Sequence, residues 1–329
     1  MSAMPVQHSL LADGALTSYL IATYALPPTT TCRLWQRGIN DVYLVDTGTA
    51  RFVLRIAPTQ WRSPSHFGAE IDLLLFLHQS GLQVPQPVPS ANGSYLHTLL
   101  APEGLRYTVL FTFISGQPYR TTARQSTRYG QALALFHTHT DTYHDQAIDY
   151  TFGPTQLVDE PLARLTPWFA DRPEELEWLS ALAHRVRDVP RQLPDHAPSY
   201  GLCHGDINNN NILLIDRQRW ALLDFEYMGY GWRIFDIATF VNNQLVQSRW
   251  SRGTWQHIDA FVAGYQAVRP LSRAEIAAAP AFVVLRQLWL LGRGALVQPN
   301  IGSAPFQQWV FTRCLPFLRQ WVATEWSIS

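Results

Sequence analysis

The chain has 329 residues, of which 47% are hydrophobic and 15% are charged, and its formal net charge at pH 7 is zero. These values describe a globular protein with substantial cores, and the length favours two domains over one. No block of like charge stands out, which argues against nucleic acid or an anionic membrane as the main partner. The three cysteines, Cys32, Cys203 and Cys314, are widely spaced and form no CxxC pair, as in proteins of the reducing cytoplasm.

The N-terminal region carries no targeting pattern. No lysine or arginine precedes Arg33, so the basic region of a signal peptide is absent. No apolar run reaches the length that would be needed to span a bilayer. We therefore expect a cytoplasmic protein that binds neither nucleic acid nor membrane, while the sequence does not indicate an oligomeric state.

The N-terminal third predicts a small sheet with one inserted helix. Leu16, Leu20 and Tyr24 recur at helical spacing, which predicts a leading helix over residues 12–24. Apolar stretches separated by turn residues predict three strands, then a helix that starts near Pro64 and ends at Gly81, and then two further strands. The predicted strands cover residues 34–37, 42–45, 51–56, 94–100 and 106–114.

The character of the chain changes after the breaker cluster Ser115-Gly116-Gln117-Pro118. Beyond it, helical periodicity dominates around a single predicted hairpin of residues 212–215 and 220–223. The fold class is therefore α+β, with a small antiparallel sheet part over residues 1–115 and a larger, mainly helical part over residues 116–329. Helices are predicted over residues 129–137, 174–186, 235–245, 255–265, 273–291 and 309–322.

Acidic and amide oxygens interrupt the two apolar runs around this hairpin. Asp206 and Asn211 are five residues apart, and Asp224 follows Asp206 by eighteen. Such oxygens suit a hard cation such as Mg²⁺, with one carboxylate left to take a proton. The alternative is that these residues simply form turns, an interpretation that suits the inner asparagines Asn208 to Asn210 best. The hairpin returns Asp224 to the neighbourhood of Asn211, so the set predicts phosphoryl transfer from a nucleotide.

A longer pattern surrounds these three residues. It consists of His204-Gly205-Asp206, Asn211-Ile212-Leu213, Leu223-Asp224-Phe225-Glu226-Tyr227-Met228-Gly229-Tyr230-Gly231 and Phe235-Asp236-Ile237-Ala238. This pattern resembles the superfamily of aminoglycoside phosphotransferases, choline kinases and homoserine kinases, more than the protein kinases. The resemblance implies a protein-kinase-like bilobal fold with ATP and Mg²⁺ as cofactors, a nucleotide-binding lobe over residues 1–115 and a catalytic, substrate-binding lobe over residues 116–329.

The resemblance also implies roles for the residues of the motif. Asp206 would be the catalytic carboxylate that orients or deprotonates the acceptor hydroxyl. Asn211 and Asp224 would hold Mg²⁺. Asp236 and His204 would be scaffold, with Asp236 bracing the catalytic loop.

In the N-terminal lobe, Arg55 stands where the superfamily usually has a phosphate-contacting lysine, and Glu70 stands at the position of its partner. Arginine is still cationic and can pair with phosphate oxygens, although an ordinary surface pair is the alternative. Val53 would touch the base from the same strand face. The remaining nucleotide contacts implied are the reduced phosphate loop with Gly38 and Asn40, and the purine hinge Phe111, Thr112, Phe113 and Ile114, of which the two phenylalanines can equally be strand core.

The acceptor pocket is expected in the helical part near Asp206. Aromatic side chains there can enclose a quaternary ammonium by cation–π attraction or stack on a sugar ring. This part of the chain is not strongly acidic, which favours a small metabolite over an aminoglycoside. Candidate contacts are Glu226, Tyr227, Tyr230, Trp232, Arg233 and the helix from Arg286 to Arg293.

Three functions fit these patterns. The first is an ATP- and Mg²⁺-dependent kinase for a small-molecule hydroxyl, such as homoserine, choline or another amino alcohol, a sugar or an aminoglycoside. The second is a bacterial stress-response-type Ser/Thr protein kinase, but the stretch between Asp224 and Asp236 is too short for a typical activation segment. The third is a non-catalytic nucleotide-binding regulatory protein, which Arg55 favours and the intact Asp206, Asn211 and Asp224 oppose.

Overall fold

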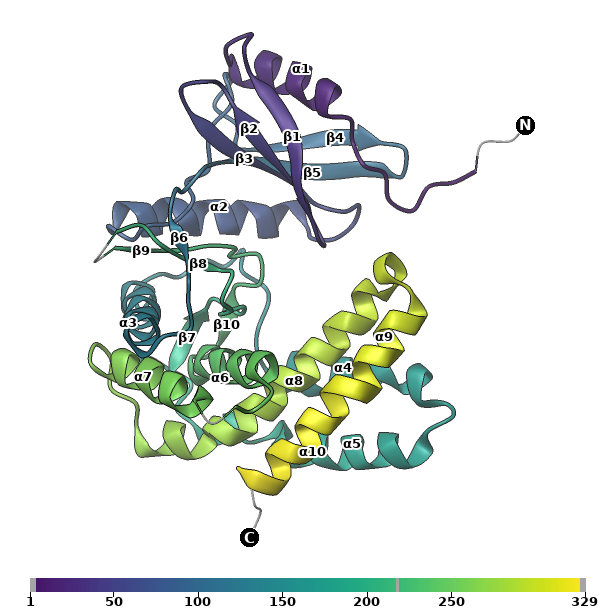
Figure 1. Ribbon diagram of the computed structural model, residues 1–329, viewed down its shortest axis with the longest axis vertical. Coiled ribbons are helices and arrows are strands. Elements are labelled where there is room, and N and C mark those ends of the chain that lie inside the picture. The colour runs from purple at the N-terminus through teal and green to yellow at the C-terminus, as the bar shows by residue number, and fades with distance from the viewer. Residues whose placement is uncertain (1–3, 217–218, 252, 326–329) are drawn as a thin grey trace. The chain divides into compact units, whose positions relative to one another are not determined.

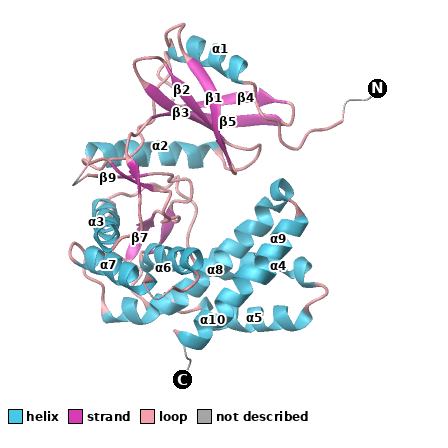
Figure 2. Cartoon of the chain, in the orientation of Figure 1, coloured by secondary structure: helices cyan, strands magenta, loops and turns pink. Residues whose placement is uncertain are grey.

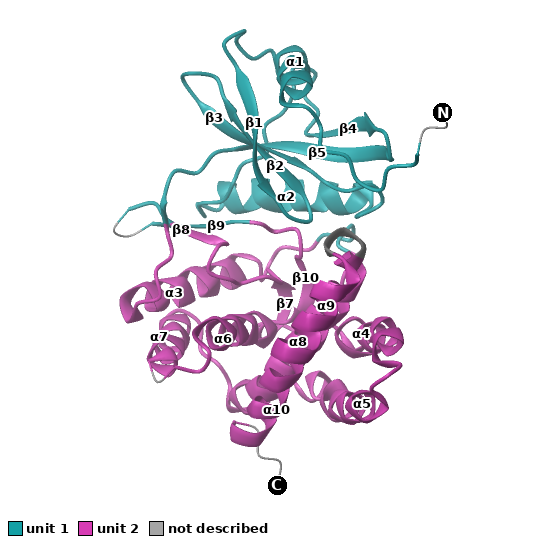
Figure 3. Cartoon of the chain, turned by 45° about the vertical axis from the view of Figure 1, so that its right-hand side comes forward, with its two compact units in different colours: residues 1–117, 145–148, 214–223 teal, residues 118–144, 149–213, 224–329 magenta. Residues whose placement is uncertain are grey.

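The computed structural model describes residues 4–216, 219–251 and 253–325, and side chains 299–301 are left out (Figure 1). The chain forms two compact units, each of which is described by itself (Figure 3). The first comprises residues 1–117, 145–148 and 214–223, and the second comprises residues 118–144, 149–213 and 224–329. The expected α+β class is confirmed, whereas the boundary after residue 115 and the functional assignment of the two lobes stay predictions.

The first unit is built on an antiparallel five-stranded sheet with the strand order β1-β2-β3-β5-β4. Helix α1 packs on one face, where Leu16 and Leu20 join a cluster with Leu54 and Ile56 of β3. Val53 and Arg55 alternate onto the other face, as the strand period of two requires. The elements are α1 (Asp13–Tyr24), β1 (Thr31–Arg37), β2 (Asp41–Asp46), β3 (Arg51–Ile56), α2 (Pro64–Gln79), β4 (Leu96–Ala101) and β5 (Gly104–Thr112).

Local signals explain the inserted helix α2. The Ser63 side chain accepts a hydrogen bond from the amide of His66, and Pro64 occupies the first turn, where its missing N–H costs nothing. Gly81 has φ +86°, so the chain leaves the helix through a conformation that favours glycine. Helix α2 buries Phe67, Leu74 and Leu77, and it also buries Glu70, whose carboxylate meets Arg55.

The second unit is mainly helical (Figure 2). Its described helices are α3 (Ala123–His139), α4 (Glu160–Leu165), α5 (Pro173–Arg187), α6 (Ile234–Ser248), α7 (Thr254–Gln266), α8 (Arg273–Ile301), α9 (Ser303–Trp309) and α10 (Leu315–Thr324). Short helical turns are η1 (Thr155–Asp159), η2 (Thr166–Phe169), η3 (Pro190–Gln192) and η4 (Val310–Cys314). The predicted hairpin forms as β8 (Ile212–Leu214) and β9 (Trp220–Leu222), and β6 (Gln117–Pro118) pairs with β8; by residue number, β9 belongs to the first unit.

A second strand pair, β7 (Tyr200–Cys203) with β10 (Gly229–Trp232), escaped prediction. Its strands are only four residues long, and β10 contains two glycines, which lower strand propensity. The structure explains why both positions are glycine. A Cβ on Gly229 would lie 2.8 Å from the Tyr150 carbonyl oxygen, and a Cβ on Gly231 would lie 2.7 Å from the Phe152 Cβ. The segment that contains Tyr150 and Phe152 therefore passes too close to β10 for a side chain at either position, and glycine permits this packing.

Helix α8 is longer and more apolar than the sequence reading allowed. The window Arg273–Gln298 is long and apolar enough to cross a membrane by length and composition. However, 67% of that window is buried inside the protein, as in the core helix of a soluble fold. Helix α8 contacts α4, α5, α6 and α9, so most of its apolar residues are covered by protein, while Ile276 and Leu296 are exposed.

Candidate active site

The loop that follows β7 is held in place by a buried carboxylate. The Asp236 Oδ2 accepts a hydrogen bond of 2.7 Å from the His204 amide, and its Oδ1 accepts one of 2.8 Å from the Gly205 amide. Asp236 lies in the first turn of α6 and is completely buried. The loop and the helix are thereby fixed to each other immediately before Asp206, which is the bracing role that the resemblance implies for Asp236.

A buried histidine supports the same carboxylate. The His137 Nε2 lies 3.0 Å from the Asp236 Oδ2, and the His137 Nδ1 lies 2.8 Å from the Tyr265 hydroxyl. Burial lowers the pKa of His137 to about 4, against the opposing effect of Asp236. Although burial alone would raise the pKa of Asp236, the hydrogen bonds that its carboxylate accepts from His137 and from the His204 amide hold it below its usual value. At neutral pH the pair is therefore a neutral imidazole and a carboxylate.

Gly205 in the motif is a steric necessity. Its φ is +81°, and a Cβ there would lie 2.2 Å from the carbonyl oxygen of Tyr227 and 2.6 Å from the Phe152 ring. Any other residue would have to displace backbone as well as adopt a strained conformation. The glycine therefore allows the catalytic loop to approach the segment that follows Asp224.

The carboxylate of Asp206 is held by three side chains of the second unit. Its Oδ1 accepts a hydrogen bond of 2.7 Å from Arg286. Its Oδ2 accepts hydrogen bonds of 2.8 Å from Asn208 and 3.0 Å from Asn211. The Asp206 side chain keeps 19% of its surface exposed, so it remains within reach of a ligand. The structure thus brings Asp206 and Asn211 together, as the five-residue spacing predicts.

Asn211 and Asp224 have the donor atoms that Mg²⁺ requires. The Asn211 Nδ2 donates to both the backbone and the side chain of Asp206, so its amide oxygen is the atom that remains for a cation. Asp224 is exposed, two residues beyond β9, and has φ +60°. Among the described residues, no three His, Cys, Asp or Glu side chains gather into a metal-binding group. One carboxylate and one amide still fit Mg²⁺, because this ion completes its shell with phosphate oxygens and water.

Arg286, a candidate acceptor contact from the sequence, forms a hydrogen bond with Asp206 that sequence reasoning did not anticipate. It is only 4% exposed, it donates a hydrogen bond of 2.8 Å to the Gly205 carbonyl oxygen, and its guanidinium lies 4.5 Å from the Trp289 ring centroid. Burial lowers its pKa, while Asp206 acts in the opposite direction. The available signal was a single arginine within the apolar run from Phe282 to Leu291, because a buried charge needs a partner.

A pocket of about 280 Å³ opens beside Asp206 within the second unit. Its walls come from the catalytic loop, α6, α8, α9 and η4, and they are mostly polar with a few apolar side chains. None of the acceptor contacts expected from the motif itself, such as Tyr230, lines it. The lining residues are Asp206, Asn208, Asn210, Thr239, Asn242, Asn243, Val246, Gln247, Arg286, Gln287, Leu290, Trp309, Arg313 and Cys314.

In the first unit, Arg55 and Glu70 form a two-point ion pair. Arg55 Nη1 lies 2.8 Å from Glu70 Oε1, and Arg55 Nη2 contacts Glu70 Oε2. Their side chains are 11% and 3% exposed, so this is not an ordinary surface pair. The Arg55 guanidinium also lies 5.0 Å from the ring centroid of Phe111, which pairs with Val53 across β3 and β5. Val53, Arg55 and Phe111 therefore lie close together.

The four residues expected to form a purine hinge differ in what they can offer. The Thr112 amide already donates to the Gln86 carbonyl oxygen at 2.9 Å, and the Phe113 amide donates to the Arg51 carbonyl oxygen at 3.2 Å. Phe111 is buried strand core, as the alternative interpretation held. Amide donors for a purine are therefore expected from Ile114 onward.

Gly38 and Asn40 lie in the bend between β1 and β2. The Gly38 amide donates a hydrogen bond of 3.0 Å to the Asn40 carbonyl oxygen, which closes the turn. A Cβ on Gly38 would meet nothing nearer than that oxygen at 4.0 Å. The space above the glycine is open, so the fold itself does not require glycine there, which is compatible with the approach of a ligand.

Comparison with known proteins assigns the family. A family model described as a phosphotransferase enzyme family matches residues 31–271. The chain belongs to this phosphotransferase family. A protein of Deinococcus radiodurans is 33% identical over 96% of this chain and 92% of its own, and a homoserine kinase of Mesorhizobium japonicum is 28% identical over 73% and 72%. The structure of an amicoumacin kinase has a TM-score of 0.74 at 18% identity, covering 93% of each chain.

Of the acceptor contacts expected for this phosphotransferase, residues of the helix from Arg286 to Arg293 line the pocket, whereas those of the motif itself lie outside it. Glu226 is 3% exposed and Trp232 is 8% exposed, with its ring centroid 5.2 Å from that of Tyr200. Tyr230 lies in β10, where its backbone pairs with Leu202. These residues shape the sheet beside the catalytic loop, and their role as substrate contacts stays a prediction.

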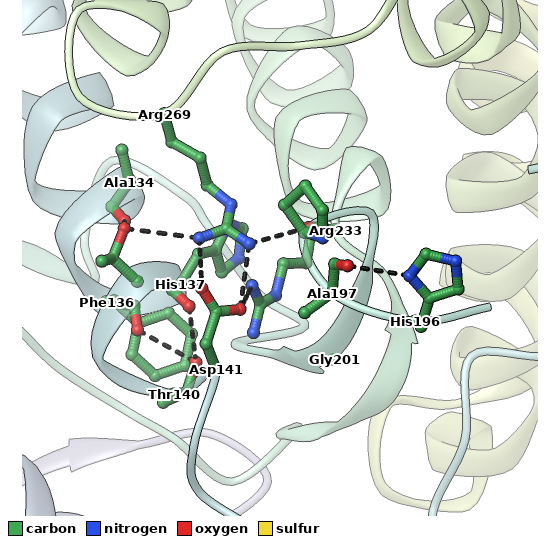
Figure 4. A network of polar contacts seen from close by, with 12 residues as sticks. Ala134, Phe136, His137, Thr140, Asp141, His196, Ala197, Gly201, Arg233 and Arg269 are labelled. Carbon is green, nitrogen blue, oxygen red and sulfur yellow. Dashed lines mark hydrogen bonds and ion pairs between the residues drawn. The ribbon is translucent and has the colours of Figure 1, made fainter. Parts of the chain in front are cut away.

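Arg233 has a structural position, which corrects its expected role as a substrate contact. It is 1% exposed and forms an ion pair with Asp141, which also accepts hydrogen bonds of 2.7 and 2.9 Å from Arg269 (Figure 4). Partial burial would raise the pKa of Asp141, but hydrogen bonds from Arg269 and Arg233 hold it below its usual value. A Cβ on Gly201 would lie 2.4 Å from the Arg233 guanidinium, so the fold encloses this arginine.

Proposed function

We propose that this phosphotransferase is an ATP- and Mg²⁺-dependent kinase whose acceptor is a hydroxyl of a small molecule. The observation that carries the proposal is the position of Asp206. Its carboxylate lines a pocket of about 280 Å³ and is bonded to Asn211, whose amide oxygen remains for a cation. A general base, a metal ligand and a space for an acceptor therefore coincide in one unit.

In the proposed reaction, Asp206 orients the acceptor hydroxyl and receives its proton as the hydroxyl oxygen bonds to the γ-phosphorus. The bond from the γ-phosphorus to the bridging oxygen breaks, and the electron pair leaves with ADP. Asn208, Asn211 and Arg286 fix the carboxylate, so little reorganisation is needed when the hydroxyl arrives. Mg²⁺, held by Asn211 and Asp224, would neutralise charge on the phosphates.

Residues of the first unit support nucleotide binding. Arg55 is fixed by Glu70, so its guanidinium is preorganised for a phosphate oxygen. Val53 and Phe111 offer apolar surface beside it, and the backbone from Ile114 onward offers donors to a purine. The amicoumacin kinase with the same fold was solved with AMP-PNP and Ca²⁺, which supports a nucleotide and a divalent cation here.

The protein-kinase alternative is less well supported. The stretch between Asp224 and Asp236 contains β10, which pairs with β7 and leads directly into α6. It is therefore part of the folded core and provides no loop of the kind that positions a peptide. The proposal also includes a cytoplasmic location, and it includes no binding to nucleic acid or to membranes.

An acceptor panel tests this function. Purified protein with ATP and Mg²⁺ should release ADP faster when metabolite hydroxyls are supplied. Asp206→Ala should lower that rate by about a thousandfold, as the loss of a general base typically does, with nucleotide binding retained. Asp195→Ala, an exposed aspartate in a turn, is the matched control and should leave the rate unchanged. Wild-type protein whose melting temperature ATP–Mg²⁺ does not raise would contradict the proposal.

A further inference from the structure

Several amide oxygens in the walls of the pocket beside Asp206 already accept hydrogen bonds from neighbours in the second unit. Gln287 Oε1 accepts from Asn242 at 2.8 Å, and Asn243 Oδ1 accepts from Gln247 at 2.6 Å. The oxygen of Gln247 in turn accepts from Asn209 at 2.7 Å. These amides are therefore oriented by the protein and have few oxygens left for a ligand.

The walls of the same pocket also contain hydrogen-bond donors that no described protein atom uses. Asn243 Nδ2 and Arg286 Nε are both buried and have no hydrogen-bond partner among the described atoms. A buried donor without a partner is unfavourable, because it has lost its hydrogen bonds to water. A ligand that accepts hydrogen bonds would remove this cost.

The charges of the pocket point in the same direction. Asp206 is the one carboxylate in the described lining, and it is already paired with Arg286. Arg313 also lines the pocket, is exposed, and forms an ion pair with no carboxylate of the described chain. It projects from η4, a π-helical turn of the kind that often redirects side chains at functional sites. The pocket therefore holds an uncompensated positive charge.

We propose that the acceptor is a small hydroxy-carboxylate, an inference that rests on the proposed kinase function. Its carboxylate pairs with Arg313 and accepts from Asn243, while its hydroxyl lies against Asp206. The hydroxyl oxygen takes the γ-phosphoryl group, its proton passes to Asp206, and ADP leaves. A volume of about 280 Å³ suits a compact metabolite and is too small for an aminoglycoside of several rings. Cationic acceptors are disfavoured, because they would meet Arg313 and find no unpaired carboxylate in the described lining.

Two triplets of compounds test the charge preference, and the members of each triplet share the same number of carbon atoms. The first triplet is glycerate, glycerol and serinol, and the second is gluconate, glucose and glucosamine. Within each triplet the first is anionic, the second neutral and the third cationic. We measure kcat/KM with ATP–Mg²⁺, and in parallel the melting-temperature shift that each compound causes. The anion should exceed the neutral compound by about tenfold in at least one triplet, since only the anion makes a charge-assisted hydrogen bond, and tenfold corresponds to about 1.4 kcal/mol.

Arg313→Gln provides the decisive comparison. It should abolish the preference for the anion through an increase in KM of about tenfold, with kcat and the neutral compounds little affected. Arg313→Lys, which keeps the charge, should restore part of the preference. Arg319→Gln, at an exposed position on α10, should change nothing.

Specific outcomes overturn the inference. It is wrong if the cationic member is preferred in both triplets, if no anion is bound or turned over better than its neutral counterpart, or if Arg313→Gln keeps the anion preference. Failure of the kinase function has a different signature, because ATP–Mg²⁺ would then not raise the melting temperature and no acceptor would stimulate ADP release.

Discussion

Arg286 on α8 donates a hydrogen bond of 2.7 Å to the carboxylate of Asp206 from a position that is 4% exposed. A second hydrogen bond, 2.8 Å long, runs from the same guanidinium to the Gly205 carbonyl oxygen. One side chain therefore fixes both the orientation of the proposed base and the loop that carries it. This two-point geometry requires a planar guanidinium, which lysine lacks.

Replacement of this arginine should separate activity from stability. Arg286→Met should lower kcat by about a hundredfold, because Asp206 loses the contact that orients it. The free energy of unfolding should fall by no more than about 3 kcal/mol, because Asp206 loses one partner but keeps its hydrogen bonds from Asn208 and Asn211 and stays partly exposed. Arg273→Met, at the exposed start of α8, is the control. A kcat equal to that of wild type would refute the positioning role.

Sequence patterns anticipated the regular parts of the fold. The alternation of Leu54 and Ile56 with Val53 and Arg55 predicted β3 and its buried face, and β3 spans residues 51–56 as expected. Pro64 predicted the start of α2. Such local signals work because the backbone, the cap and the apolar period all favour the same structure.

Long-range contacts could not be anticipated in the same way. Arg286 lies eighty residues from Asp206, and no local pattern links the two. The β7–β10 pair depends on glycines that pass close to Tyr150 and Phe152, so propensity alone argued against it. Arg233 looked like a substrate contact because of its place beside the motif, whereas burial and its pairing with Asp141 decide its role. The sequence motif identified the loop that carries Asp206, but most residues that line the pocket beside Asp206 lie outside the motif.

Gly205→Ala should be strongly destabilising. The new Cβ would lie 2.2 Å from the Tyr227 carbonyl oxygen, at a φ of +81° that disfavours alanine. We expect a loss of at least about 3 kcal/mol in the free energy of unfolding in urea, which combines backbone strain with displaced contacts. Gly68→Ala is the matched control, since nothing lies within 4 Å of its Cβ in the middle of α2. It should stabilise by about 0.5 to 1 kcal/mol. Equal effects at both sites would contradict the steric explanation.

Asp224→Asn should weaken the proposed metal site without damaging the fold. Asparagine tolerates the left-handed conformation found here, at φ +60°, better than most residues do. The Mg²⁺ concentration that gives half-maximal activity should rise by about tenfold or more, because a charged ligand becomes neutral. The urea midpoint should stay close to that of wild type. An unchanged Mg²⁺ dependence would remove Asp224 from the metal site.

Arg55→Lys tests the departure of this chain from the usual lysine. Lysine keeps the charge but cannot make the two-point contact with Glu70 that arginine makes. We expect the KM for ATP to rise by about tenfold, with a smaller change in kcat, because the phosphate contact loses its preorganisation. Arg51→Lys, on the same strand, is the control. Should both variants bind ATP as wild type does, Arg55 does not contact the phosphates.

The buried His137–Asp236 pair should make the protein sensitive to acid. The pKa of His137 falls from 6.5 to about 4 on folding, so between these values the unfolded chain takes up a proton that the native protein excludes. Stability therefore decreases as the pH falls from 6.5 to about 4, by on the order of 3 kcal/mol. The lowered pKa of Asp236 acts in the same direction at still lower pH. Urea unfolding measured across this range should show the decrease, and His137→Gln should flatten it. A stability that stays constant between pH 6.5 and pH 4 in the wild-type protein would show that His137 takes up its proton as readily in the native state as in the unfolded one.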